Sequence, residues 1–250
     1  MNTFFDFYRY TNPSNVAFNL MDMRHLSMLL ILSLGIAIIC LLYRRSKKRD
    51  FFMKAFAIFI FILEGVRQVS FFLVQGWFLP QYLPFHLCNI MIFLIVYYSF
   101  TENEKVGEVL YGLGLPGYFA ALLFPDWTMF PFFNFYGLHS WIIHALLVSF
   151  TLMLLLTGEI RPHAKNMVYV LAFAIIIAIP IYVINVILGT NFLFINAGSP
   201  GSPLEVLVNF FGTPWFILPY FLLVILIIGL LYVPWYVRDR KIERRCYGEN

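Results

Sequence analysis

The sequence predicts an all-α membrane protein with seven transmembrane helices, an N-terminus outside and a C-terminus in the cytoplasm. Two observations lead to this prediction. Of the 250 residues, 61% are hydrophobic and only 12% are charged, whereas a soluble domain carries about 25% charged residues. The 17 Lys and Arg residues also alternate in their distribution along the chain.

Seven apolar stretches are each long enough for a bilayer-spanning helix, which needs about 20 residues. They are continuously apolar rather than alternating, and this favours helices over a transmembrane barrel. The predicted spans are Leu26–Tyr43, Phe52–Gly76, Leu83–Phe100, Val106–Phe124, Tyr136–Leu156, Met167–Gly189 and Phe210–Trp235.

The orientation follows from the basic residues, because Lys and Arg accumulate on the cytoplasmic side of membrane helices. Fourteen of the 17 lie in or beside every second gap: six in residues 44–54, one at Lys105, two in residues 161–165 and five in residues 238–245. The gaps after the second, fourth and sixth predicted spans contain none. Because these basic runs flank membrane spans, they indicate no nucleic-acid partner, and membrane lipid is the expected environment.

The predicted organisation has three parts: residues 1–25 as an extracytoplasmic interfacial segment, residues 26–236 as the transmembrane domain, and residues 237–250 as a basic cytoplasmic tail. The first part contains acidic residues and no uninterrupted apolar region, so no signal peptide is expected. Its aromatic residues, Phe4, Phe5, Phe7, Tyr8 and Tyr10, are typical of a membrane interface.

Polar side chains at membrane depth are costly and therefore mark candidate functional sites. In the second predicted span, Glu64, Arg67 and Gln68 share one helix face because they lie three and four residues apart. Two interpretations stay open. Glu64 and Arg67 could form an internal pair that pins the helix, or Arg67 could present its cation to an anionic head group or carboxylate.

Further polar residues open the third and fifth predicted spans. The segment LPFHLCNIM carries His86, Cys88 and Asn89, and the fifth span opens with His139. His144 lies about 140° further round that helix. We therefore expect His139 and His144 not to serve one site, and His144 to be a helix–helix contact. The three cysteines, Cys40, Cys88 and Cys246, form no disulfide framework.

These polar residues share one depth in the predicted bundle. All of them map to its outer half, whereas no comparable residues map to the inner half. The sequence therefore predicts one polar cavity that opens outward or sideways into the outer leaflet. The members of this set are Arg67, Gln68, His86, Cys88, Asn89, Asp126, His139, Asn185 and Asn191.

Several segments resemble a known family: LPFHLCNIM, GLGLPGYFAALLFPDW, FYGLHS, NVILGTNFLFIN and GTPWF. From about residue 10 to residue 235, the chain resembles the YwaF-like integral membrane family of bacteria. This resemblance implies a multi-pass protein of the bacterial cytoplasmic membrane.

A more distant resemblance is to the transmembrane-protein-164-type phospholipid acyltransferases, which are described as cysteine-dependent. The shared pieces are Pro84-x-His86-Leu87, the stretch Ala121–Pro125 and His139. In those enzymes the nucleophilic Cys immediately precedes the His of the motif. That position here is Phe85, and the nearest thiol is Cys88, one helical turn deeper.

Two classes of function remain open. The first is thiol-based acyl transfer or hydrolysis on a membrane lipid, with Cys88 as nucleophile and His86 and His139 as acid–base groups. The substrate would bind to Arg67, Gln68, Asn89, Asp126, Asn185 and Asn191. Weaker variants use Ser140 or Ser70 as nucleophile, or a metal on His86, His139 and Asp126; we expect no metal and no cofactor.

The second class is non-enzymatic binding, sensing or transport of an anionic solute or lipid in the same cavity. Transporters often show internal repeats, and none is visible in this sequence.

Overall fold

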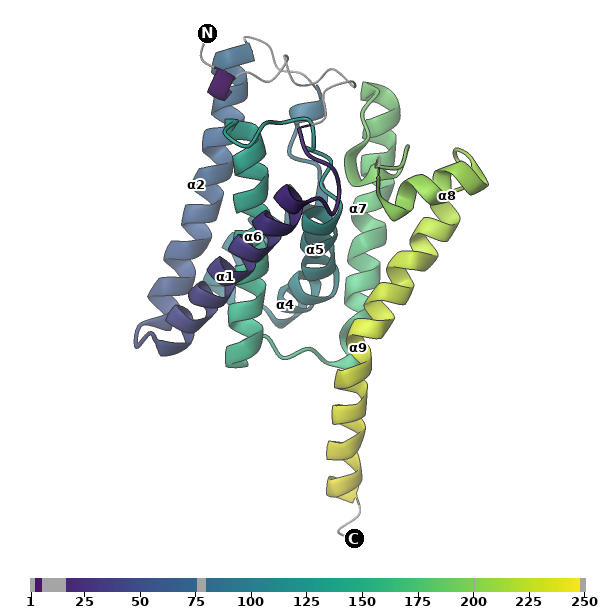
Figure 1. Ribbon diagram of the computed structural model, residues 1–250. Coiled ribbons are helices and arrows are strands. Elements are labelled where there is room, and N and C mark those ends of the chain that lie inside the picture. The colour runs from purple at the N-terminus through teal and green to yellow at the C-terminus, as the bar shows by residue number, and fades with distance from the viewer. Residues whose placement is uncertain (1–2, 6–16, 76–79, 200, 248–250) are drawn as a thin grey trace.

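The structure, a computed structural model, describes residues 3–5, 17–75, 80–199 and 201–247, and they form a bundle of helices (Figure 1). Among these residues, six helices are long and apolar enough to cross a membrane. The all-α class is therefore confirmed. The helices are α1 (Met23–Arg45), α2 (Arg49–Gln75), α3 (Leu87–Thr101), α4 (Glu104–Val109), α5 (Leu115–Leu123), α6 (Phe135–Thr157), α7 (Met167–Leu188), α8 (Pro203–Phe211) and α9 (Ile217–Tyr247).

The third predicted span is shorter than expected. Helix α3 begins at Leu87 rather than Leu83 and has 15 residues. At 1.5 Å per residue it is about 22 Å long, less than the hydrocarbon thickness of about 30 Å. Pro84 disfavours helical backbone at Leu83, and the extended backbone of His86, with ψ of 151°, makes that residue the N-cap. The number of seven spanning helices is therefore not confirmed by helix length.

The fourth predicted span forms as α4, a π-helical turn at Leu110–Gly114, and α5. In this turn the N–H of Leu115 donates to the carbonyl of Leu110. The turn comes directly before Pro116, which has no N–H for an ordinary helix bond. Gly112 permits close packing here, since a Cβ atom on it would lie 3.0 Å from both Tyr232 and Val170.

The predicted boundaries of the last span are wrong. Residues 203–211 form the separate helix α8, which ends at Gly212 with φ of +71°, a conformation that favours glycine. Helix α9 begins at Ile217 and continues to Tyr247. The boundary predicted at residue 236 between membrane domain and basic tail therefore falls inside one continuous helix. The connection between α7 and α9 carries the short helix α8 and a 3₁₀ turn, η6 (Phe192–Phe194).

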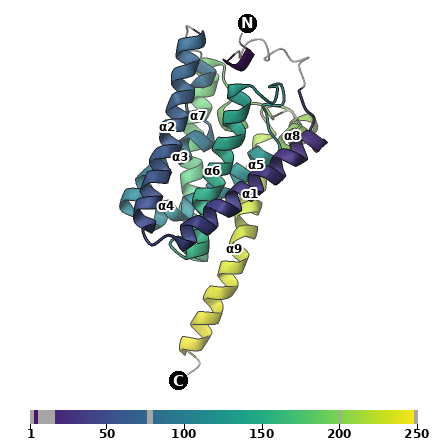
Figure 2. The same cartoon turned by 60° about the vertical axis from the view of Figure 1, so that its left-hand side comes forward.

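Helix α1 crosses α6 obliquely on the outside of the bundle, while α2 packs on α3 and α6 (Figures 1 and 2). Large side chains fill the space between the helices, and Tyr118, Phe150 and Leu147 have no exposed surface. Apolar side chains also cover the outside: Leu30 is 63% exposed, Ile176 67% and Leu230 62%. Such a surface suits hydrocarbon and not water.

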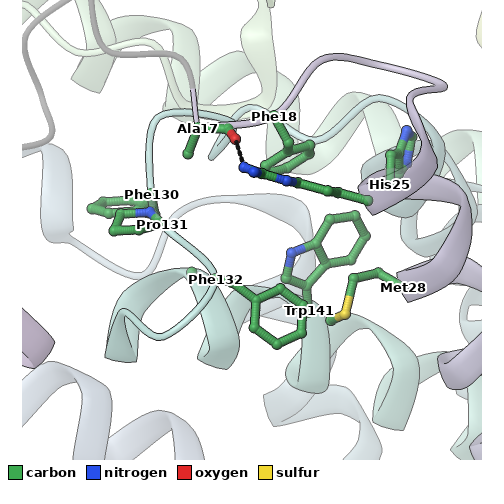
Figure 3. A pocket seen from close by; sticks show the side chains of 10 residues that line it. Ala17, Phe18, His25, Met28, Phe130, Pro131, Phe132 and Trp141 are labelled. Atoms are coloured by element: carbon green, nitrogen blue, oxygen red, sulfur yellow. Dashed lines mark hydrogen bonds between the residues drawn. The ribbon is translucent and has the colours of Figure 1, made fainter.

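The start of α1 is fastened to the end of α5 by His25, which is fully buried. Its Nε2 lies 2.9 Å from the carbonyl oxygen of Leu122, and its Nδ1 accepts from the N–H of Met21. A small pocket of about 30 Å³ adjoins it, next to Trp141 (Figure 3). That volume suits about two waters rather than a ligand, so this pocket is structural. The aromatic residues Phe7, Tyr8 and Tyr10, predicted to lie at the interface, fall outside the described residues.

The lower end of the bundle in Figure 1 is held together around Glu108 of α4, which is 3% exposed. Its carboxylate accepts hydrogen bonds from the N–H of His163 at 2.9 Å, from Asn166 at 2.8 Å and from the hydroxyl of Tyr232. Tyr232 belongs to α9, so this cluster joins α9 to α4 and to the connection between α6 and α7.

Two further hydrogen bonds fix the same part of α9. Trp235 donates to the hydroxyl of Tyr111 at 2.7 Å, and Arg238 donates to the carbonyl of Pro162 at 2.9 Å. The guanidinium of Arg238 also lies 4.5 Å from the ring centre of Trp235. The middle of α9 is therefore firmly attached to the bundle at its lower end.

Candidate functional site

A cavity of about 610 Å³ lies in the upper half of the bundle, where α2 ends and α3 and α6 begin. This volume falls within the usual range of ligand sites, about 300–1,000 Å³. Helices α2, α3, α5, α6, α7 and α9 all contribute to its wall, as does the connection between α7 and α9. Six of the nine residues predicted for one polar site line it: Arg67, His86, Cys88, Asn89, Asp126 and His139.

The polar wall is organised by Glu64 of α2, which is 8% exposed. Its carboxylate accepts hydrogen bonds from Nε and Nη2 of Arg67, from Gln68 at 2.9 Å and from Asn89 of α3 at 2.7 Å. Arg67 also lies over the ring of Phe71, 5.3 Å from its centre. The prediction that Glu64 and Arg67 form an internal pair is confirmed. Among the described residues, Nη1 of Arg67 has no hydrogen-bond partner.

Both histidines of α6 line the cavity, so the expectation that they could not share one site is wrong. The lining residues of α6 are Tyr136, His139, Ser140, Ile143 and His144. Their spacing of three and four residues makes one wide stripe, and the two histidines stand at its two edges. His139 Nε2 lies 3.6 Å from Glu64 Oε2. His144 stacks on Trp127, with ring centres 5.0 Å apart, and its Nδ1 lies 2.6 Å from the carbonyl of Ser140.

Cys88, in the first turn of α3, lines the cavity. His86, the N-cap residue of this helix, also lines it. The ring of His86 contacts Phe192 and Phe194, with ring centres 5.2 and 5.4 Å apart. Among the described residues, no other residue forms a hydrogen bond with the Cys88 thiol. Phe85 does not line the cavity and packs on Phe192, with ring centres 5.5 Å apart. Of the motif position 85 and Cys88, only Cys88 therefore lines the cavity. Of the two serines considered as weaker alternatives, Ser140 lines the cavity and Ser70 does not.

The backbone at the start of α3 adds donors beside this thiol. The first N–H groups of a helix have no partner within it. The side chain of His86 makes no capping hydrogen bond that would satisfy them. The first bond of the helix in this region runs from the N–H of Ile90 to the carbonyl of His86. The N–H groups of Leu87, Cys88 and Asn89 therefore make the start of α3 suited to negative charge.

Asp126 belongs to the connection between α5 and α6, outside the spanning helices. It has exposed surface and lines the cavity. Burial of the group within the surrounding protein raises the pKa of this carboxyl above its usual value. The backbone N–H of Asp126 and the nearby charge of Arg67 oppose that rise.

Three buried polar atoms on the cavity wall lack hydrogen-bond partners among the described residues: Nε1 of Trp127, Nε2 of His139 and Oγ of Ser199. Their residues are 5%, 4% and 4% exposed. Unpaired polar groups cost free energy when they are buried, and native proteins satisfy nearly all of them. A ligand with several oxygen acceptors would satisfy these groups.

Three predicted site residues lie off the cavity wall. Gln68 supports Glu64 from within α2. Asn185, 1% exposed, binds the backbone of Phe192, at 2.8 Å to its N–H and 2.9 Å to its carbonyl. Asn191 binds the backbone of Ala197 in the same way, at 2.9 and 2.8 Å. Both asparagines shape the connection after α7, which covers the cavity.

Other wall residues were not assigned to the site from the sequence. The sequence does not indicate that Trp127 and Ser199 belong to the site, because an unpaired buried atom is a property of the folded chain. Glu64 was considered only as a partner of Arg67. Its hydrogen bond with Asn89 joins two helices and was not predicted, because the two residues are far apart in the sequence. Within the described ranges, no group of three or more His, Cys, Asp and Glu side chains is arranged to hold a metal ion.

The six described helices long enough to cross a membrane define a multi-pass membrane protein, and a cavity lies within its bundle. Its family is shown by sequence comparison. The chain belongs to the TMEM164 family, whose model matches residues 20–232. Searches of curated proteins and of solved structures found no match.

Proposed function

We propose that this protein is a lipid acyltransferase or lipid hydrolase that uses Cys88 as its nucleophile. One observation carries the proposal: Cys88 faces the same cavity as His86, His139 and His144. The resemblance to cysteine-dependent phospholipid acyltransferases supports it. The chain departs from their motif at Phe85, but a thiol one helical turn along takes a place on the cavity wall.

The reaction requires a nucleophile, a histidine that carries the proton, an acceptor, and groups that stabilise a negative oxygen. The Cys88 thiol gives its proton to a histidine and attacks the carbonyl carbon of a lipid ester, forming a C–S bond. The ester C–O bond then breaks, and the departing oxygen takes the proton from the histidine. An acceptor hydroxyl or water next attacks the thioester, gives its proton to the same histidine and releases the thiol. The N–H groups at the start of α3 stabilise the negative oxygen that forms at the carbonyl in each attack.

His139 is the best candidate for this histidine. A carboxylate that orients the imidazole is typical of nucleophilic sites, and Glu64 lies 3.6 Å from its Nε2. Arg67 is bound to Glu64 on one side only, so its free Nη1 can contact a phosphate oxygen of the lipid. Asp126 and Asn89 complete the polar wall on which the head group rests.

This proposal includes the membrane arrangement predicted from the sequence. We propose seven crossings, with α3 as the short third crossing, the N-terminus outside and the basic C-terminus in the cytoplasm. The cavity then lies in the outer half of a bacterial cytoplasmic membrane, at the depth of lipid ester groups.

A phospholipid analogue with a thiol-reactive group at the ester position tests the proposal. The purified protein in phospholipid vesicles is treated with the analogue, and the modified peptide is identified by mass spectrometry. We expect modification of Cys88 in the wild type and none in Cys88→Ser. Cys40→Ser is the matched control, because Cys40 is buried between α1 and α6 and does not line the cavity. Unmodified Cys88 in the folded wild type would overturn the nucleophile assignment.

A second function uses the same cavity without covalent chemistry. It is favoured by the absence, among the described residues, of a hydrogen bond between the Cys88 thiol and a histidine. The cavity would then bind an anionic solute or lipid through Arg67, Trp127 and Ser199. Tight binding of a phospholipid that survives in Cys88→Ser, with no release of lysophospholipid by the wild type, would select this function.

A further inference from the structure

We infer that the acyl chain of a lipid enters the cavity sideways from the membrane, between α5 and α9, past Ala120 and Ile227. The inference deepens the proposed function by adding an acyl-chain site and rests on it only for the assignment of the ligand as a lipid.

The cavity wall has a polar part and an apolar part. Glu64, Arg67, Asn89, Asp126 and His139 come from α2, α3, α6 and the connection after α5. The wall on α5, α7 and α9 is formed mainly by small or apolar side chains: Pro116, Gly117, Ala120, Ala121, Ala174, Ile177, Ala178, Leu223, Val224, Ile227 and Ile228. A ligand that matches both parts has a polar head and an apolar tail.

Ala120 and Ile227 belong both to the cavity wall and to the exposed surface. On α5, Ala120 lies between the exposed Phe119 and the wall residue Ala121. On α9, Ile227 is 38% exposed and lies between the exposed Leu226 and the buried wall residue Ile228. These two residues therefore mark the apolar edge where the cavity meets the lipid-facing surface.

The other approach to the apolar wall passes the connection after α7. Leu193, Phe194 and Ile195 of this connection line the cavity and cover part of it, and Ser199 and Ser202 are buried there. The exposed wall residues on this side are Gln81, Asp126 and Pro203. Entry from water past this cover would bring an acyl chain through an aqueous phase, at about 0.8 kcal/mol for each CH₂ group. Entry from the side keeps the chain in apolar surroundings throughout. The chain then occupies the wall of α5 and α9, and the head group meets the unpaired atoms of Trp127 and Ser199.

A phospholipid with a photoreactive diazirine near the end of one acyl chain tests the site without reliance on Cys88. The full-length protein is reconstituted in vesicles containing the probe, irradiated and digested, and the adducts are quantified by mass spectrometry. We expect adducts on the wall residues of α5 and α9 in the wild type. Ala120→Trp and, separately, Ile227→Trp fill the entry and should each reduce these adducts about tenfold.

Phe119→Trp and Leu226→Trp are the matched controls, because both residues face outward on the same helices and neither lines the cavity. They should leave the adducts on the wall unchanged. The melting temperature of each variant in detergent identifies any variant that fails to fold, and the two entry variants lie on different helices. Wall adducts that persist in both folded entry variants would overturn the inference.

The same experiment separates this inference from the proposed function. Wall adducts that depend on Ala120 and Ile227, together with an unreactive Cys88, would support the acyl-chain site and remove the thiol mechanism. A reactive Cys88 with no wall adducts would support the thiol mechanism and contradict lateral entry.

Discussion

Asn89 of α3 donates a hydrogen bond of 2.7 Å to Glu64 of α2. The same carboxylate oxygen accepts from Gln68 and from Arg67. One buried carboxylate therefore joins two helices and also neutralises the cation at the cavity. Its removal should affect both the stability of the bundle and the shape of the polar wall.

Glu64→Gln should destabilise the protein by about 3 kcal/mol or more, because it leaves the guanidinium of Arg67 buried without a countercharge. The double variant Glu64→Gln/Arg67→Gln should recover part of this loss. Denaturant unfolding in detergent measures both. Gln68→Ala removes one hydrogen bond and no charge, so it should cost about 1 kcal/mol. Equal losses in the single and double variants would contradict a coupled ion pair.

A cysteine at position 85 should not replace Cys88 as the reactive thiol. Phe85 packs on Phe192 and does not line the cavity, whereas Cys88 does. In the variant Phe85→Cys/Cys88→Ser, the reactive phospholipid analogue should therefore leave residue 85 unmodified. Peptide mass spectrometry makes the measurement, with Phe85→Cys alone as the control that retains Cys88. Efficient modification of residue 85 would show that the chain preserves the motif position of the related enzymes.

Asn134 is the buried N-cap of α6, the helix that carries His139 and His144. Its Oδ1 accepts from the N–H groups of Tyr136 and Gly137, at 2.9 and 3.3 Å. Asn134→Ala should cost about 1–2 kcal/mol of unfolding free energy, because both N–H groups lose their acceptor.

Asn103→Ala is the matched control for this prediction. Asn103 caps α4 by the same geometry but is exposed, so water replaces the lost bonds. Its cost should be the smaller of the two in the same denaturant titration. A larger loss in Asn103→Ala would contradict the argument from burial.

The proposed orientation predicts where the C-terminus lies. A fluorescent reporter that folds only in the cytoplasm should be active when it is fused after residue 250. A reporter fused in the connection between α7 and α8, which has no Lys or Arg, should be inactive. The reverse pattern would contradict the orientation and the outer position of the cavity.

The sequence predicted the location of the site better than its detailed chemistry. Hydropathy and basic residues set the depth of Arg67, His86 and His139, and all three line the cavity. The start of α3 was misplaced because hydropathy does not register backbone conformation, and the backbone of His86 is extended. The angle between His139 and His144 round the helix was taken to place them at different sites, but the cavity is wide enough for both to line it. Asn185 and Asn191 were selected for polarity, yet they bind local backbone, and only the folded chain reveals that use.

Helix α9 is attached to the rest of the chain unevenly along its length. Tyr232, Trp235 and Arg238 hold its middle by hydrogen bonds to Glu108, Tyr111 and Pro162. Its first part is held by one such bond, from the hydroxyl of Tyr220 to the carbonyl of Leu193 at 3.1 Å, and it borders the cavity from Tyr220 onward. A displacement of this first part that widens the gap beside α5 therefore breaks the bond between Tyr220 and Leu193 and can leave the bonds of Tyr232, Trp235 and Arg238 in place.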